Sequence, residues 1–289
     1  MNMLPPPFLD NPYKTKVDGL SVVRSMLSKR NQRKSILKLG LILTMIFGLA
    51  SVGFSQTDET EKPSYTFRGN ISATNNGISL VPTFSLGRPA VVFELSLGGE
   101  RLSFDPEIRF AMDGKPWSFI LWWRYKVIKS EKFNLNMGVH PAFVFREVLS
   151  TNGFKNDLMV AQRFFASEVS PSYNISKKVK IGLYYLHSLG LDQGLTKNTQ
   201  FLAFNMNFSD IHLSDQIYLN IRPQVFYLKM DERDGYYANT SVLIAKRNFP
   251  LAIGSIVNRS LRSDIIGNKD WVWNVSLNYS FHKTFARNN

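Results

Sequence analysis

Residues 271–281 read Trp-Val-Trp-Asn-Val-Ser-Leu-Asn-Tyr-Ser-Phe. The odd-numbered positions of this stretch are all apolar or aromatic, whereas the even-numbered positions from Asn274 to Ser280 are small and polar. Because side chains alternate between the two faces of a strand, the pattern predicts one apolar face and one face suited to water. A strand of about 9–11 residues with aromatic residues near both ends is typical of a transmembrane β-barrel. For this stretch alone, an edge strand of a soluble β-sandwich is the alternative.

The same alternation recurs along the chain from Tyr65 onward, with almost no helical period. The predicted strands cover residues 65–71, 78–86, 91–97, 102–110, 117–126, 133–145, 159–175, 180–188, 200–208, 217–228, 236–246, 251–258 and 271–281. These segments are odd in number, which does not suit a bacterial barrel with both chain ends in the periplasm. We therefore expect the Gly87-Arg88-Pro89 stretch to bend one long strand over residues 78–97, which leaves about 12 strands, or about 14 if the amino end supplies another.

The connections between the later predicted strands alternate in length. Residues 174–178 and 247–250 are short connections, whereas residues 189–198 and 260–269 are longer. Outer-membrane barrels alternate short periplasmic turns with longer extracellular loops in this way. The predicted fold class is therefore all-β, a closed antiparallel transmembrane β-barrel. Its last strand should pair with its first, because an open edge in hydrocarbon would leave backbone groups unsatisfied.

Prolines are the main evidence against this interpretation. Five of them lie inside predicted strands, on the face that the pattern assigns to lipid: Pro82, Pro106, Pro141, Pro171 and Pro223. Each proline removes a hydrogen bond from a strand ladder. A soluble sandwich would suffer equally, and it would not explain so many aromatic residues on faces that meet water. The barrel therefore remains the preferred interpretation.

Two stretches, residues 101–110 and 115–126, resemble parts of uncharacterised, porin-like outer-membrane β-barrel proteins of Gram-negative bacteria. The resemblance is one of architecture and covers most of residues 65–281. It implies an outer-membrane location and contact with outer-membrane lipid and lipopolysaccharide. It implies no substrate.

The closing strand resembles the C-terminal signal that such barrels present to the barrel-assembly machinery. Leu277, Tyr279 and Phe281 match the alternating apolar positions of that signal. The chain departs from the usual pattern in its tail, residues 282–289, because the final aromatic residue of the signal usually lies at or near the end. The resemblance implies that the barrel-assembly machinery is a partner.

The front of the chain has the layout of a secretory signal peptide. A basic stretch, residues 29–38, precedes an apolar stretch, residues 39–50, and small residues follow. The apolar stretch is too short for the roughly 20 residues of a membrane-spanning helix. The predicted organisation is a leader and signal peptide over residues 1–55, a linker over 56–64, the barrel over 65–281 and a tail over 282–289.

Composition excludes several classes of protein. The chain has 289 residues, no cysteine and a formal net charge of +13. The lack of cysteine rules out disulfides and thiolate metal sites. Eight basic and two acidic residues lie within residues 1–55, and beyond them no basic run of the kind that a nucleic-acid site needs is present. We expect no nucleic-acid partner and no cofactor.

Placing the apolar positions outward leaves a set of charged side chains facing the lumen. The predicted lumen-lining residues are Glu94, Asp105, Glu107, Arg109, Arg124, Lys126, His140, Arg146, Glu168 and Arg222. Opposite charges there either form a salt-bridged plug or line a pore whose transverse field orients polar solutes. The predicted function is a passive or weakly selective channel for small polar solutes. The alternative is a closed barrel with a structural or surface-interaction role.

Hairpin geometry predicts that three of these charges lie together. A tight turn centred on Gly114 sets Asp105 opposite Arg124, and the preceding turn sets Glu94 beside Asp105. Two adjacent carboxylates repel each other unless a cation lies beside them. We therefore expect Glu94, Asp105 and Arg124 to form one inward cluster in the periplasmic half of the barrel.

An outer-membrane lipid hydrolase is a third hypothesis, and it requires a histidine and a serine that share a proton. The nearest match is His187-Ser188, which strand alternation sends to opposite faces. The residue two positions after His140 is Ala142, so that histidine lacks a serine. No enzyme activity is therefore predicted. No metal site is predicted either, because the four histidines are widely separated: His140, His187, His212 and His282.

Overall fold

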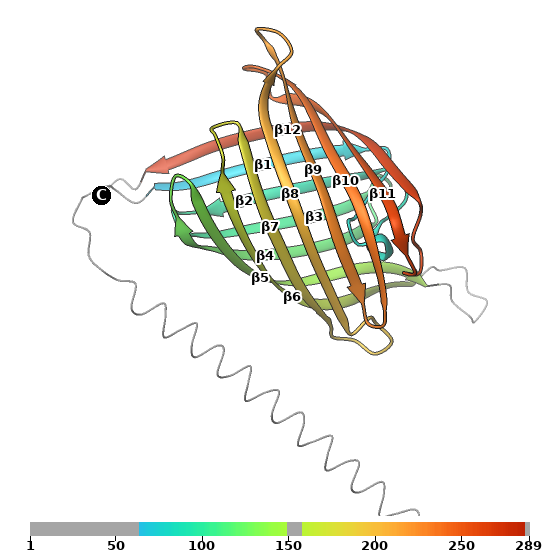
Figure 1. The fold of residues 1–289 in the computed structure, drawn as a ribbon. Helices are drawn as coiled ribbons and strands as arrows, with labels where there is room; N and C mark the ends of the chain where they lie inside the picture. The colour runs from blue at the N-terminus through green and yellow to red at the C-terminus, as the bar shows by residue number, and fades with distance from the viewer. Residues whose placement is uncertain (1–63, 149–157, 287–289) are drawn as a thin grey trace, which may run out of the picture. The chain divides into compact units, whose positions relative to one another are not determined.

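The computed structural model describes residues 64–148 and 158–286, which form one closed antiparallel β-barrel (Figure 1). Its strands are β1 (Ser64–Thr74), β2 (Ala90–Gly98), β3 (Leu102–Ala111), β4 (Pro116–Lys129), β5 (Phe133–Val148), β6 (Leu158–Asn174), β7 (Val179–Gly190), β8 (Asn198–His212), β9 (Ile217–Met230), β10 (Arg233–Lys246), β11 (Leu251–Ser263) and β12 (Trp271–Ala286). The prediction of a closed all-β barrel of about 12 strands is confirmed. The expected leader and signal peptide lie outside the described residues.

The first and last strands close the barrel. β1 pairs with β12 from Ser64↔Ala286 to Thr74↔Ser276, as predicted. The closing strand therefore does not stop at Phe281, where the sequence pattern ends it, but continues to Ala286. Among the described residues, no helix is long and apolar enough to cross a membrane.

The two ends of the barrel differ. We call the end where β1 begins and β12 ends the terminal rim, and the opposite end the loop rim. The connections at the terminal rim are short, such as residues 175–178 and 247–250, whereas those at the loop rim include residues 75–89 and 191–197. This is the alternation that the sequence predicted.

β12 shows how sequence alternation becomes two faces. Trp271, Trp273 and Leu277 stand 57%, 57% and 52% exposed on the outer surface. The alternate positions turn inward, where Asn274 is buried and Ser276 lines a cavity. Large apolar side chains are exposed on every strand of the barrel, so the outer wall is apolar around its whole circumference.

Four prolines each interrupt the strand ladder on one side. β2 and β3 pair at Glu94↔Glu107 and resume in the same register at Leu97↔Phe104, with no pairing at Pro106. On its other side Pro106 pairs with Leu121 of β4. The same one-sided gaps occur beside Pro141, Pro171 and Pro223. A residue without an N–H is tolerated because the barrel gives up one stretch of ladder beside it.

The expectation that residues 78–97 form one bent strand is wrong. Residues 75–89 are a connection between β1 and β2, here called the inward loop, and a 3₁₀ turn, η1 (Pro82–Phe84), lies within it. Pro82 therefore starts a short helical turn, a position that suits its fixed φ, and does not face lipid. Gly87 turns the chain back toward β2 with φ of 76°. The apolar alternation of this segment reflects packing inside the barrel.

The alternation of residues 117–126 predicts that Trp117 lies on the outer face, and this prediction is also wrong. The register between β3 and β4 shifts where Arg109 pairs with Ser118 but Phe110 pairs with Pro116. This β-bulge inserts one residue, and a bulge re-aims the side chain that it carries. Trp117 is consequently 1% exposed, and its indole meets the inward loop.

Candidate functional site

The inward loop is held inside the barrel by contacts to opposite walls. The indole Nε1 of Trp117 donates to the carbonyl oxygen of Phe84 at 2.8 Å, and Arg146 donates to the carbonyl oxygen of Thr83. The Phe84 ring packs edge-on against Phe164 of β6, with ring centroids 5.1 Å apart. These contacts fasten η1 to β4, β5 and β6.

The other wall of the barrel also holds the inward loop. Leu80 and Val81 pack against a buried cluster that includes Phe201 of β8, Phe226 of β9 and Tyr237 of β10. Phe226 and Tyr237 stack with their ring planes 11° apart. The loop therefore crosses the lumen near the loop rim, and apolar side chains fill the space beside it.

A polar cavity of about 650 Å³ lies on the side of the lumen formed by β1–β3 and β9–β12. The inward loop contributes residues from Gly77 to Leu80 to its wall. Small amides and hydroxyls make up most of the remainder: Asn70, Ser72, Thr74, Asn220, Gln224, Asn239, Ser241, Ser255, Asn274, Ser276, Asn278 and Ser280. The lumen is thus divided into an open polar side and a side filled by side chains.

An ion-pair network occupies the filled side. Arg124 Nε donates to Glu168 Oε1 at 2.7 Å, and Arg124 Nη1 donates to Asp105 Oδ2 at 3.2 Å. The Tyr184 hydroxyl donates to the other oxygen of Glu168 at 2.6 Å. Glu168 is only 3% exposed, and its carboxylate is held by both donors. A side chain at Gly138 would clash, because its Cβ would lie 2.9 Å from Glu168 Oε1.

The predicted cluster of Glu94, Asp105 and Arg124 forms only in part. Asp105 lies opposite Trp122, and Ser103 lies opposite Arg124, because the hairpin is centred on Asp113, where Ala111 N–H donates to the Lys115 carbonyl oxygen, and not on Gly114 as expected. Arg124 still reaches Asp105 diagonally, as a long side chain can. Glu94 does not join them.

Glu94 belongs to a second charged group, on the cavity wall. It pairs with Glu107 across β2 and β3, and Arg109 Nε donates to Glu107 at 2.6 Å. Arg222 of β9 lines the same cavity. The ten predicted residues are therefore distributed over several environments.

Three predicted residues have other surroundings. His140 is buried against Trp122, with ring centroids 3.8 Å apart, and its Nδ1 has no hydrogen-bond partner among the described residues. Arg146 holds the inward loop. Lys126 lies two residues after Arg124 on β4, on the same face and nearer the terminal rim, and it is half-buried.

The side chains that fill the lumen were not predicted from the sequence. The alternation of residues 78–86 predicts a lipid-facing Phe84, and no feature of the sequence distinguishes Tyr184. One signal was available in residues 201–204, where Phe201, Leu202, Ala203 and Phe204 are apolar at every position. A strand that is apolar on both faces faces lipid on one side and a packed interior on the other.

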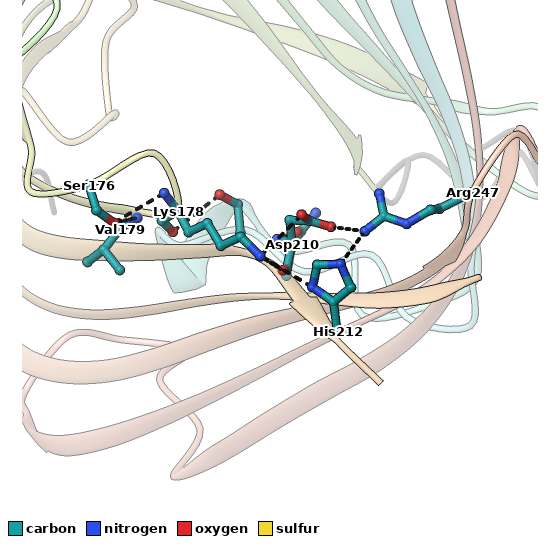
Figure 2. Close-up of polar contacts among 8 residues, drawn as sticks. Ser176, Lys178, Val179, Asp210, His212 and Arg247 are labelled. Carbon is teal, nitrogen blue, oxygen red and sulfur yellow. Dashed lines mark hydrogen bonds and ion pairs between the residues drawn. The ribbon is translucent and has the colours of Figure 1, made fainter. Parts of the chain in front are cut away.

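A further polar cluster fastens strand ends at the terminal rim (Figure 2). Arg247 Nη2 lies 2.5 Å from Asp210 Oδ1 and 3.0 Å from His212 Nε2. Lys178 Nζ approaches His212 Nδ1 at 3.2 Å and the Asp210 carbonyl oxygen at 3.0 Å. Asp210 thereby joins the end of β8 to two neighbouring turns, which is a structural role.

The His187-Ser188 pair does not have the geometry of a catalytic pair. His187 and Ser188 are consecutive on β7, where they pair with Gln200 and Thr199 of β8. Consecutive strand residues point to opposite faces, so these two cannot exchange a proton directly. Within residues 64–148 and 158–286, no three His, Asp or Glu side chains are grouped to hold a metal ion.

Comparisons with known proteins give a likeness of fold only. No protein-family model and no curated protein matches the sequence. Among solved structures, the NanC porin aligns with a TM-score of 0.45 and 11% identity, covering 76% of this chain and 99% of that one. A KdgM porin in complex with disordered oligogalacturonate aligns with a TM-score of 0.44 and 11% identity, covering 75% and 99%. LpxR from Salmonella typhimurium aligns with a TM-score of 0.43 and 10% identity, covering 74% and 99%.

At these identities, no activity passes from those proteins to this chain. What the chain's own geometry provides is a closed twelve-stranded barrel, an apolar outer wall, and a lumen that an inward loop divides into a filled side and a polar cavity.

Proposed function

We propose that the protein is an outer-membrane channel for small polar solutes. The observation that carries this proposal is the polar cavity of about 650 Å³, which runs beside the inward loop and is lined by amides, hydroxyls and a few charges. A barrel that served only as a structural element would have no need of a hollow lined with groups able to replace a solute's hydration.

The outer wall supports the membrane location. An apolar belt around all strands would be costly in water, whereas lipid solvates it without penalty. The closed ladder leaves no strand edge, so backbone groups find partners within the barrel. Because β1 begins and β12 ends at the terminal rim, that rim would face the periplasm and the loop rim would face the exterior. Lipopolysaccharide and the barrel-assembly machinery are then expected partners.

A closed structural or surface-interaction barrel is the second candidate, and the inward loop favours it. Phe84, Leu80 and Val81 together reach both walls of the lumen near the loop rim. A loop packed this firmly could block passage, which would leave the loop-rim surface as the functional part. Conductance separates the two candidates.

The test is single-channel recording of the purified barrel in planar lipid bilayers in KCl. The channel function predicts stepwise currents, and Ser276→Trp, which places a bulky ring in the cavity, should reduce them severalfold. Leu277→Trp is the matched control, because the next residue of the same strand faces outward. No current from folded, inserted protein would favour the closed barrel. Equal effects of the two variants would show that the cavity is not the conducting path.

A further inference from the structure

Two charged cavity residues have no ion-pair partner in contact with them among the residues that the structure describes. Glu94 of β2 and Arg222 of β9 both line the polar cavity, and both are exposed to it. Neither forms an ion pair with any residue among 64–148 and 158–286. The other charges of the cavity differ, because Glu107 and Arg109 neutralise each other.

These two residues lie on well-separated strands. In the closed strand order, β1, β12, β11 and β10 stand between β2 and β9 on one side, and a longer series of strands stands between them on the other. The two charges therefore belong to opposite walls of the cavity, one negative and one positive.

They also lie at a similar height in the barrel. If the strand pairing is followed from Glu94 through β1, β12, β11 and β10, the residue reached is Gln216, just before β9 begins. If the pairing is followed the other way, through β3 to β8, the residue reached is Glu232, just after β9 ends. Because strands in a closed barrel are tilted, the true level of Glu94 falls between these limits. The middle of β9, where Arg222 lies, is at that level.

Neutral amides hold both charged groups in place. Asn70 Nδ2 donates to Glu94 Oε2 at 2.9 Å, and the Ser280 hydroxyl in turn donates to Asn70 Oδ1 at 3.1 Å. Arg222 Nε donates to Asn207 Oδ1 at 2.9 Å. Each charged group is thus oriented by a neutral side chain and not by a contacting ion of opposite charge. This arrangement leaves one carboxylate and one guanidinium available to a solute.

We propose that Glu94 and Arg222 form a binding site for zwitterionic solutes, with the solute ammonium at Glu94 and its carboxylate at Arg222. The proposal rests on the channel function and names its solute class. Such a solute brings two opposite charges with no net charge, so it matches both walls at once. A solute with a single charge satisfies one wall and leaves the other uncompensated.

The experiment uses the KCl current of the reconstituted barrel as its readout. 6-Aminohexanoate and γ-aminobutyrate are the zwitterionic probes, and butyrate and butylammonium are controls with one charge each. The zwitterions should reduce the current in a saturable manner. Each single-charge control should need at least tenfold higher concentration for the same reduction.

Substitutions at Glu94 and Arg222 test whether these two residues bind the zwitterion. Glu94→Gln and Arg222→Gln should each raise the half-blocking concentration of zwitterion about tenfold, which corresponds to about 1.4 kcal/mol. The double variant Glu94→Arg with Arg222→Glu restores one charge of each sign, so it should recover block, with the solute reversed. Glu147→Gln is the matched control, because Glu147 lies at the loop rim and pairs with Arg88.

The outcomes separate this proposal from the channel function. Absence of KCl current would overturn the channel function itself. KCl current with no zwitterion block, or with block that neither single variant weakens, would overturn only the site. Block by butyrate as strong as that by the zwitterions would also overturn it, because Arg222 alone would then suffice.

Discussion

Arg124 shows how one side chain can hold several strands together. It lies between Asp105 of β3 and Glu168 of β6, and its guanidinium stacks over Trp122 at 4.3 Å. Glu168 is almost fully buried, so its charge depends on the partners that the barrel provides. Removing only one partner of such an ion pair is strongly destabilising, because the other charge then stays buried without a partner.

We predict that Arg124→Met destabilises the barrel markedly. Breaking a buried pair by removing one partner costs about 3–5 kcal/mol, and the lower end applies because Arg124 is itself one-third exposed. The measurement is urea unfolding in lipid bilayers. The double variant Arg124→Met with Glu168→Gln should recover part of the loss, because the carboxylate no longer stays buried and unpaired.

Arg163→Met is the matched control for Arg124. It removes an arginine whose side chain is 60% exposed and whose ion pair with Asp192 lies in solvent, so its effect on unfolding should be small. Equal losses for the two methionine variants would contradict the assigned role of Arg124.

The inward loop is the element on which conduction is expected to depend. Its backbone is tied to β4 by the hydrogen bond from the Trp117 indole to the Phe84 carbonyl oxygen. Trp117→Phe keeps an aromatic ring but leaves that carbonyl without its donor, which costs about 1–3 kcal/mol. We expect a looser loop, seen as larger or more frequently fluctuating single-channel currents.

Trp123→Phe is the control on the same strand. Trp123 is 49% exposed on the outer face and pairs with Phe104 and Val139. Its replacement should leave the current unchanged. If the two phenylalanine variants conduct alike, the loop does not govern passage.

The connection between β7 and β8 contains a clamp that responds to pH. Hydrogen bonds from the Arg163 guanidinium and backbone N–H hold the pKa of the Asp192 carboxyl below its usual value of 3.8. A carboxyl whose pKa is depressed in the folded state stabilises that state fully above its usual pKa, and the contribution is lost as pH falls through the depressed value.

Hydrogen exchange at Leu191, whose N–H donates to the Arg163 carbonyl oxygen, reports on this clamp. Compared at each pH, the wild type should be better protected than Asp192→Asn between pH 5 and 7. The difference should vanish only below about pH 3.8, when the wild-type carboxyl is protonated. A difference that vanishes already near pH 6 would assign the effect to another group.

At the scale of the whole molecule, the pairing between β1 and β12 joins the first strand to the last and closes the barrel. The ring of Phe281 lies over Gly69 of β1, where an added Cβ would be 2.1 Å from its Cζ. Phe67 packs on the same ring, with centroids 5.4 Å apart. An aromatic ring that covers a glycine on the neighbouring strand fixes the register of that pair.

We therefore predict that Phe281→Asn reduces insertion into the outer membrane severalfold, and more than Phe285→Asn does. Phe285 pairs with Tyr65 at the terminal rim and is 45% exposed, so it contributes less to the seam. The measurement is the fraction of heat-modifiable, folded protein in outer-membrane extracts. Equal or reversed losses would place the assembly signal at the end of β12.

The sequence alone determined the type of fold, because period-two alternation is a local property. In β12 the apolar residues Trp273, Val275, Leu277 and Tyr279 are exposed on the outer wall, and the polar residues Asn274, Ser276, Asn278 and Ser280 line the cavity, since the outer wall meets an apolar solvent and the lumen meets water. The closure between β1 and β12 followed from the same pattern together with the cost of an open edge. The strand number was right although residues 78–86, which were counted with residues 91–97 as one bent strand, belong to the inward loop.

Tertiary structure decided what the lumen contains. An alternating apolar segment has the same sequence pattern whether its apolar side chains contact lipid or a packed interior. The position of Phe84 could therefore not be predicted from the neighbouring sequence. Trp117 was misplaced for a related reason, because a one-residue bulge reverses facing and leaves no clear mark in the sequence.

The positions of the charged groups were also determined partly by the sequence and partly by the tertiary structure. Strand parity was sufficient to send Asp105 and Arg124 to one face, and long side chains then tolerate an error in register. The opposition of Glu94 and Arg222 depends on barrel closure and strand tilt, which bring together residues that are distant in sequence. No local pattern encodes that distance, and only the closed barrel sets the two charges across one cavity.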